Sequence, residues 1–308
     1  MKTFIRWAVI GVVTGIIAFA VFQSLQTQTA SHAQTIPAVV SGDVLSAQPE
    51  QVQSVVTESG TSVEDLVKTT LENPTMDNGV SLAKELRQNS LKFLEQAKGQ
   101  WLYTRTTIYQ PYHATNDKNP VPAHYPDGTE IPYTTIVDVW NRVNAEGICE
   151  LQVIRVTDEK GNELGLSVGS LASKQMVNLT LGTTDSFGVV PIDSTANEFL
   201  QSVFRFQSDT RSGFDFATEQ NTEFIFTFSI KLEQPMLFEG VANAIRGTIE
   251  YTVDPETGFV KLQQIKVLDL EGETFSRAWT ELNEISILTN FSIDSLPTSA
   301  AEFLKGME

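Results

Sequence analysis

Cysteine is almost absent from this 308-residue chain, which contains only Cys149. A single cysteine excludes an internal disulfide, so the core alone must hold the fold together. The neighbours Ile148 and Leu151 indicate the interior of a strand, where a lone cysteine usually serves as a small apolar side chain. With 41% hydrophobic residues, the chain has enough apolar side chains to fill a substantial core.

Basic side chains are also scarce. The chain has 21 Lys and Arg against 38 Asp and Glu, which gives a net charge of -17. Lys2 and Arg6 are the only charges before residue 34, so the remainder has 19 basic minus 38 acidic residues, or -19. A surface this acidic repels phosphate. The composition therefore predicts no binding of nucleic acid, and no attachment to an anionic bilayer through basic patches.

Recognisable catalytic motifs are also scarce. The sequence has no HExxH and no glycine-rich phosphate loop. His113 and His124 share the proline-rich loop 110–132, but their spacing matches no metal-ligand pattern. The sequence therefore predicts a protein that is not an enzyme and that holds no metal or cofactor. A hydrolase is the least favoured alternative, because the clustered carboxylates of DPETG and EGE belong to turns.

An apolar N-terminal segment is the strongest single signal in the chain. Trp7 to Phe22 contains no charge and follows Lys2 and Arg6, a pattern typical of a segment that enters a membrane with its positive flank in the cytoplasm. Residues 1–22 are therefore interpreted as a signal anchor or signal peptide. Two outcomes stay open: an uncleaved single-pass anchor, with the C-terminal domain outside the cytoplasm, or a secreted or periplasmic protein cleaved near Ala33.

The rest of the chain predicts an α+β fold. Residues 23–61 have few large side chains and are interpreted as a flexible tether, followed by one exported domain over 62–308. Helical spacing predicts helices within 62–98, the first capped by Ser62, and a further helix near 195–206 capped by Ser194. Apolar alternation and short turns predict a large antiparallel sheet. Its strands are expected at 101–109, 134–144, 148–157, 163–169, 174–181, 223–232, 245–254, 259–269 and 274–288.

The order of these elements resembles a known family. An amphipathic helix ending at Gly99, the strand "GQWLYTRTTIY", a meander, a helical insertion and the run beginning "GTIEYTVDPETGFVKLQQIKV" are similar to the LolA/LppX-like lipoprotein-carrier half-barrels. The similarity covers roughly residues 80 to 290. It implies a curved antiparallel half-barrel packed on one or more helices, with acyl chains bound on the concave side.

The stretch "EFIFTFSIKL" is the candidate binding site. Its alternation places Phe224, Phe226 and Phe228 on one face of a strand, and Ile249 and Tyr251 are expected beside them on a neighbouring strand. This face either lines a ligand cavity or packs as ordinary core, and both interpretations stay open. The loop after 109 is a candidate lid because it is long, stiff and aromatic. Its aromatic residues are Tyr109, Tyr112 and Tyr125.

These observations lead to two hypotheses of function. The first is a membrane-tethered, exported domain at the cell envelope that binds a hydrophobic small molecule, such as a lipid or lipid-linked group. The second is a cell-envelope module that binds a protein partner and no ligand. A carrier requires an apolar cavity, whereas an interaction module requires a filled core and an exposed patch.

Overall fold

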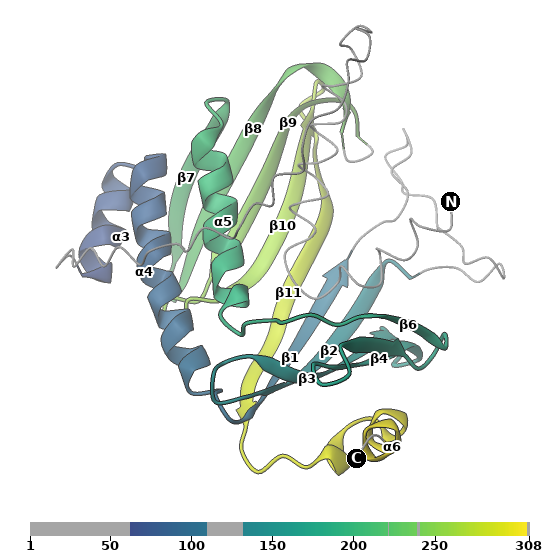
Figure 1. Ribbon diagram of the computed structural model, residues 1–308. Coiled ribbons are helices and arrows are strands. Elements are labelled where there is room, and N and C mark those ends of the chain that lie inside the picture. Colours follow the sequence, from purple (N-terminus) through teal and green to yellow (C-terminus); the bar gives the residue numbers. More distant parts are fainter. Residues whose placement is uncertain (1–61, 110–131, 221, 239–240, 307–308) are drawn as a thin grey trace, which may run out of the picture.

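The computed structural model describes residues 62–109, 132–220, 222–238 and 241–306 (Figure 1). The predicted membrane segment, the tether and most of the 110–132 loop lie outside these ranges. Within the described ranges, no helix is both long and apolar enough to cross a membrane.

The domain begins with two helices separated by Pro74. Helix α3 (Val63–Glu72) starts as predicted at Ser62, whose Oγ accepts a hydrogen bond from the backbone N–H of Asp65 at 3.2 Å. Helix α4 (Met76–Glu95) is capped in the same way by Thr75. Because a proline cannot continue a helix, the predicted helical region is split at this position.

Eleven strands follow in one antiparallel sheet, with the order β6-β5-β4-β3-β2-β1-β11-β10-β9-β8-β7. Consecutive strands pair with each other from β1 to β6 and from β7 to β11, whereas β6 and β7 lie at opposite edges. The pairing of β1 with β11 joins the two halves of the sheet. The strands are β1 (Trp101–Tyr109), β2 (Thr134–Val143), β3 (Cys149–Asp158), β4 (Glu163–Ser170), β5 (Gln175–Asn178), β6 (Thr183–Ser186), β7 (Ser212–Glu219), β8 (Glu223–Phe238), β9 (Val241–Val253), β10 (Val260–Asp269) and β11 (Thr274–Leu288).

The α+β class with a large curved antiparallel sheet is therefore confirmed, with four additional elements and one correction. Edge strands β6 and β7 were not predicted, nor were the short 3-10 helix η2 (Ile293–Ser295) and the C-terminal helix α6 (Thr298–Lys305). Helix α5 (Ser194–Ser208) is present, but the predicted cap at Ser194 is wrong. The helix already includes Ser194, and the preceding Asp193 makes no capping hydrogen bond through its side chain.

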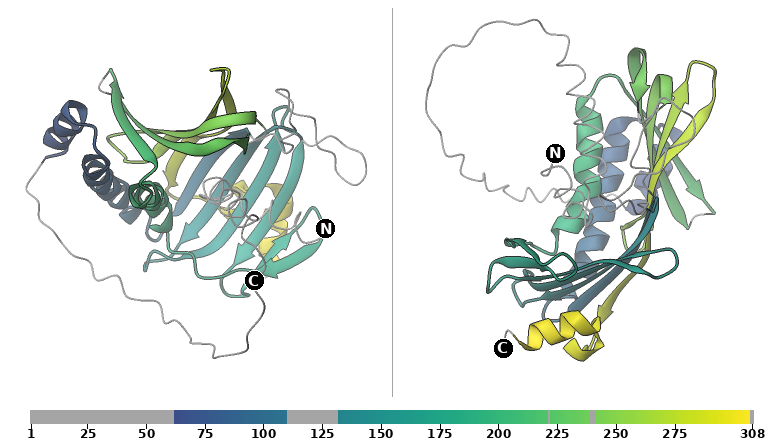
Figure 2. Two further views of the ribbon diagram at one scale, coloured as in Figure 1. Left: turned by 90° about the horizontal axis from the view of Figure 1, so that it is seen from above. Right: turned by 90° about the vertical axis from the view of Figure 1, so that its right-hand side faces the viewer.

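The sheet bends sharply between its two halves, so that it has a concave and a convex face (Figure 2). The bend lies close to β1 and β11, whose pairing contains a register shift between Arg105 and Thr106. Such bulges bend a strand and increase its twist. Helices α4 and α5 lie inside the bend, whereas α6 lies outside it against the opposite face (Figure 2).

The helices on the concave side build the main core with β7 to β11. Its apolar side chains include Leu82 and Leu86 of α4 and Val203 of α5, all of them fully buried. On the convex side, Ala300 and Leu304 of α6 pack in a separate cluster that contains Trp101. The concave face of the sheet is therefore covered by α4 and α5, and the convex face by the C-terminal helix α6.

Candidate functional site

The alternating row on β8 lies on one face, as predicted. Phe224, Phe226, Phe228, Ile230 and Leu232 are all buried, with exposed fractions from 0 to 8%. Register pairing continues this face across the sheet, because Phe228 pairs with Ile249 of β9 and Ile249 pairs with Ile265 of β10. The row therefore belongs to the concave face that α5 partly covers.

Much of this row packs against aromatic rings. Phe226 contacts Phe199 of α5 and Phe216 of β7, with ring centroids 5.1 and 5.0 Å apart. Phe228 stacks on Phe206 of α5, with centroids 4.8 Å apart. These contacts have the density and geometry of a packed core.

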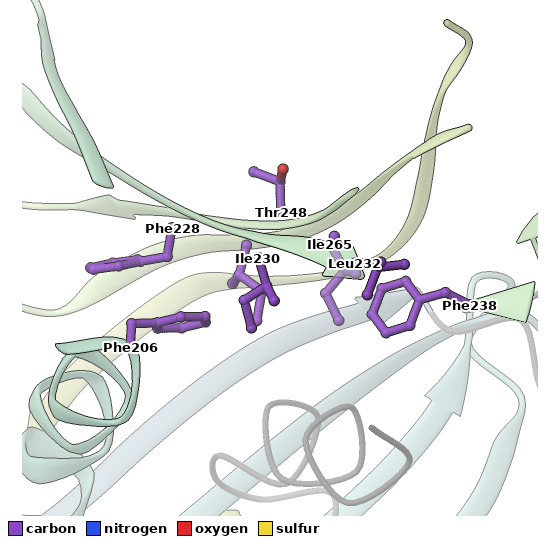
Figure 3. Close-up of a pocket in the computed structure, with 9 residues that line it drawn as sticks. Phe206, Phe228, Ile230, Leu232, Phe238, Thr248 and Ile265 are labelled. Atoms are coloured by element: carbon purple, nitrogen blue, oxygen red, sulfur yellow. The ribbon is translucent and has the colours of Figure 1, made fainter. Parts of the chain in front are cut away.

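A small cavity lies at the upper end of the row, between α5 and the sheet (Figure 3). Its volume is about 20 Å³, which is room for one water-sized sphere and not for an acyl chain. The rings of Phe206 and Phe228 close one end, and Leu232 and Phe238 lie toward the other (Figure 3). The lining residues are Phe206, Phe228, Ile230, Leu232, Phe238, Gly247, Thr248, Ile249 and Ile265.

The predicted ligand-binding residues divide into two groups around this cavity. Phe228 and Ile249 line it. Phe224, Phe226 and Tyr251 lie on the same face but contact aromatic neighbours instead: Phe224 contacts Phe216, and the other two contact Phe199. Ligand binding by these five residues stays a prediction.

Tyr251 is the most polar of the predicted group. Burial raises the pKa of its hydroxyl to about 12, and the nearby Ser202 side chain of α5 opposes that shift. The hydroxyl is buried, and its contact with Ser202 falls outside the geometry of a hydrogen bond. Tyr251 therefore acts as a large neutral side chain beneath α5 at physiological pH.

Of the predicted lid residues, only Tyr109 lies within the described ranges; Tyr112 and Tyr125 lie outside them. The Tyr109 ring is nearly parallel to that of Trp279, with centroids 5.9 Å apart and 12° between the planes. It also meets the edge of Tyr133. Because Ile108 belongs to the concave face, the next residue points to the convex one, so Tyr109 faces away from the phenylalanine row.

Sequence reasoning missed an apolar cluster that extends the concave face past the helices. Ile108 of β1 and Val137 and Val139 of β2 are buried, and Ile154 and Val156 of β3 pack beside them. The cluster contains strand residues only, with none from the described helices. The alternation of residues 134–144 predicts that Val137 and Val139 share one face of a strand. It does not predict that β1 and β3 are the neighbouring strands that complete the cluster.

The convex face carries a buried carboxylate that sequence reasoning also missed. Asp138 is fully buried and accepts hydrogen bonds from the hydroxyl of Tyr103 at 2.6 Å and from Nη2 of Arg155 at 2.7 Å. Burial and the Asp138 carboxylate together raise the pKa of Tyr103 to about 12. Arg105 lies near the same carboxylate, at 3.8 Å. The two arginines compensate the buried charge, which is the arrangement of a structural ion-pair network.

Cys149 and the described acidic side chains are further candidates for reactive or metal-binding groups. Burial raises the pKa of the Cys149 thiol to about 12, so the thiol stays protonated at neutral pH. In the part of the chain that the structure describes, no group of His, Cys, Asp and Glu has the arrangement of a metal site.

Fold and site together define an α+β protein with a curved, open antiparallel sheet and helices on its concave side. No family model matches the chain, and no curated protein matches it. Among solved structures it is similar to MucB in complex with MucA(peri), with a TM-score of 0.33, 10% identity and coverage of 70% of this chain and 59% of that one. It is similar to the Pseudomonas aeruginosa MucA/MucB complex, with a TM-score of 0.32, 13% identity and coverage of 70% and 62%.

A third similar structure is a DUF1329 family protein from Desulfovibrio piger ATCC 29098. Its TM-score is 0.22, with 7% identity and coverage of 71% of this chain and 98% of that one. The present chain thus spans about three fifths of the length of the two MucB chains. Similarities at these TM-scores do not establish a shared fold.

Proposed function

We propose that this protein binds the acyl chain of a lipid or lipid-linked molecule on the concave face of its sheet. One observation carries the proposal: the apolar face continues past the helices, from Phe228 at the cavity to Ile108 and Val139 on the next half of the sheet. An apolar sheet face needs an apolar partner. A hydrocarbon chain suits this face, because the chain is apolar and flexible enough to follow a curved sheet.

The size of the cavity sets a condition on binding. Pockets that bury a small-molecule ligand usually enclose roughly 300–1,000 Å³, whereas the cavity here measures about 20 Å³. An acyl chain therefore requires the ring of Phe206 to leave Phe228. A hydrogen bond from Gln207 Nε2 to Asp77 of α4, exposed and 2.8 Å long, holds the C-terminal part of α5 near that ring. Since an exposed hydrogen bond contributes little, the main cost of moving this end of α5 is the loss of the buried contact between Phe206 and Phe228.

The predicted N-terminal anchor completes the proposal. In this arrangement residues 7–22 hold the domain at the outer surface of a membrane, and residues 23–61 let it reach lipids or lipid-linked proteins there. The acidic surface keeps the domain off anionic headgroups. The ligand would therefore enter through the apolar face rather than through charge attraction.

The test is native mass spectrometry on the full chain, purified from the membranes of its own host, followed by lipid extraction. We expect one acylated molecule per chain, retained after detergent exchange. The change Ile154→Asn, on the concave face of β3, should lower that retention. Leu151→Asn is the matched control, because Leu151 is also partly buried on β3 but packs on the convex face beneath α6.

Two outcomes would overturn the proposal. The first is a full chain without bound lipid, as expected if residues 7–22 of the chain itself pack on the concave face. The second is equal retention in both variants, which would place the lipid elsewhere.

A protein partner is the second candidate function, and the open sheet favours it. Strand β6 is an edge strand with every residue exposed, and β7 forms the opposite edge. Edge strands offer unpaired backbone groups to a partner strand. If this function is correct, the full chain would copurify with a protein and no lipid, and a proline at Thr184 would release that protein.

A further inference from the structure

Two polar atoms lie buried within the apolar concave face. The Nε2 atom of Gln263 on β10 and the Oγ1 atom of Thr280 on β11 have no hydrogen-bond partner among the described residues. The two residues are direct cross-strand partners, so their side chains share one face. Buried polar side-chain atoms are usually paired, and an unpaired donor in an apolar environment destabilises the protein. A polar group of a bound molecule would supply the hydrogen-bond partner that both atoms lack.

The pair occupies the middle of the proposed ligand face. Gln263 is the cross-strand partner of Tyr251 in β9, and Thr280 is the cross-strand partner of Ile108 in β1. On one side, Tyr251 lies beneath α5 through its contact with Phe199. On the other side, Ile108 belongs to the apolar cluster of β1 to β3. A ligand that runs along the concave face from the cavity to this cluster would thus pass over the pair.

The chemistry of the pair selects an uncharged hydrogen-bond acceptor. The amide N–H₂ of Gln263 donates, and the hydroxyl of Thr280 donates or accepts. Neither carries a charge, so a buried carboxylate would lack compensation. The neighbouring cations are engaged elsewhere: Lys261 pairs with Glu223 and Lys266 with Glu250. Arg277 also has an interaction partner already.

We infer that Gln263 and Thr280 bind the carbonyl oxygen of an acyl ester or amide, so that the ligand is an esterified or amidated acyl chain. A free fatty acid or a plain hydrocarbon then binds more weakly. This inference rests on the proposed function, because it assumes that the concave face takes an acyl chain. It adds the chemical class of the group at which the chain is attached.

The test compares three probes of equal chain length on the full chain: methyl palmitate, palmitic acid and hexadecane. Each probe displaces a fluorescent acyl probe, and its affinity is measured. We expect the ester to bind best, by about three- to tenfold over hexadecane, which corresponds to one net hydrogen bond. The variants Gln263→Met and Thr280→Val keep side-chain volume but remove the polar atoms. Each should reduce the preference for the ester over hexadecane while leaving hexadecane affinity unchanged.

Two controls separate a specific loss from a general one. Gln264→Met changes the next residue of β10, which faces the other side of the sheet, and Thr274→Val changes an exposed threonine of β11. Both should keep the preference for the ester. In the ligand-free protein, Thr280→Val should raise the melting temperature, because it removes an unpaired buried hydroxyl.

The outcomes distinguish this inference from the proposed function. If the parent protein binds none of the three probes, the proposed function fails. If it binds ester and hexadecane equally, or if Gln263→Met and Thr280→Val leave the ester preference intact, the acyl face stands and the carbonyl site is refuted. Preference for palmitic acid would likewise refute the carbonyl site, since it would require a charged partner.

Discussion

Gly258 offers the sharpest test of how the sheet is attached to the helices. It ends the DPETG turn between β9 and β10, and its φ of +71° lies in the left-handed region that disfavours residues with a side chain. A Cβ atom at this position would lie 1.9 Å from the carbonyl oxygen of Leu86 in α4 and 2.8 Å from Oγ of Ser90. The turn thus touches the backbone of α4 at a distance that only glycine permits.

The cost of Gly258→Ala has two sources. The left-handed backbone alone costs about 1–2 kcal/mol for a residue with a Cβ. The contact must also open by about 1 Å, because real Cβ atoms essentially never approach closer than 3.0 Å. That movement threatens the hydrogen bond of 2.9 Å from Asn89 Nδ2 to the carbonyl of Pro255, which contributes about 0.5–1.5 kcal/mol. With the packing that is lost, we expect a destabilisation of at least about 3 kcal/mol.

Gly272→Ala is the matched control. Gly272 lies in the turn between β10 and β11 with a φ of +86°, but nothing lies within 4 Å of its added Cβ. We expect only the backbone cost of about 1–2 kcal/mol. Urea unfolding followed by tryptophan fluorescence gives both free energies. Equal losses in the two variants would refute the reasoning, because they would show that the contact with α4 contributes nothing.

Four further predictions follow from the sequence and the structure. Phe226→Ala should cost about 3–5 kcal/mol of unfolding free energy, whereas Phe228→Ala should cost less because its ring borders the cavity; equal costs in urea unfolding would contradict this. Stability should be complete below about pH 9 and should fall as the pH rises toward 12, since folding raises the pKa of Cys149, Tyr103 and Tyr251 to about 12. The variant Tyr251→Phe should flatten that decline, and an unchanged slope would assign it to other groups. A reporter active only in the cytoplasm should stay silent when fused after Glu308, and activity would refute the predicted export. A chain that starts at Ser62 should melt within a few degrees of the full chain, and a larger drop would show that residues 23–61 contribute to the core.

Local signals were sufficient for most of the elements. The alternation in "EFIFTFSIKL" predicted both a strand and its buried face, because successive side chains on a strand point to opposite sides. Ser62 predicted the start of α3, because its hydroxyl satisfies a free N–H of the first turn whatever the rest of the fold. Short turns predicted antiparallel neighbours, because they leave no room for a crossover.

Elements with weaker local signals escaped prediction. Strand β7 contains only Phe214 and Phe216 as large apolar residues, and it becomes a strand by pairing with β8. Helix α6 is short, with Ala300, Ala301 and Leu304 buried against the convex face. Short segments depend on tertiary contacts more than on propensity, so their own residues do not identify them.

By itself, the sequence determined the alternation of the nine predicted strands, the start of α3, the acidity of the surface and the apolar N-terminal segment, since each depends only on neighbouring residues or on composition. The tertiary structure alone decided that β1 pairs with β11 and that the sheet bends there. That pairing places Gln263, Thr280 and Ile108 in one row across three strands. Residues so far apart in the chain share no local pattern, so only the register of the folded sheet brings them together.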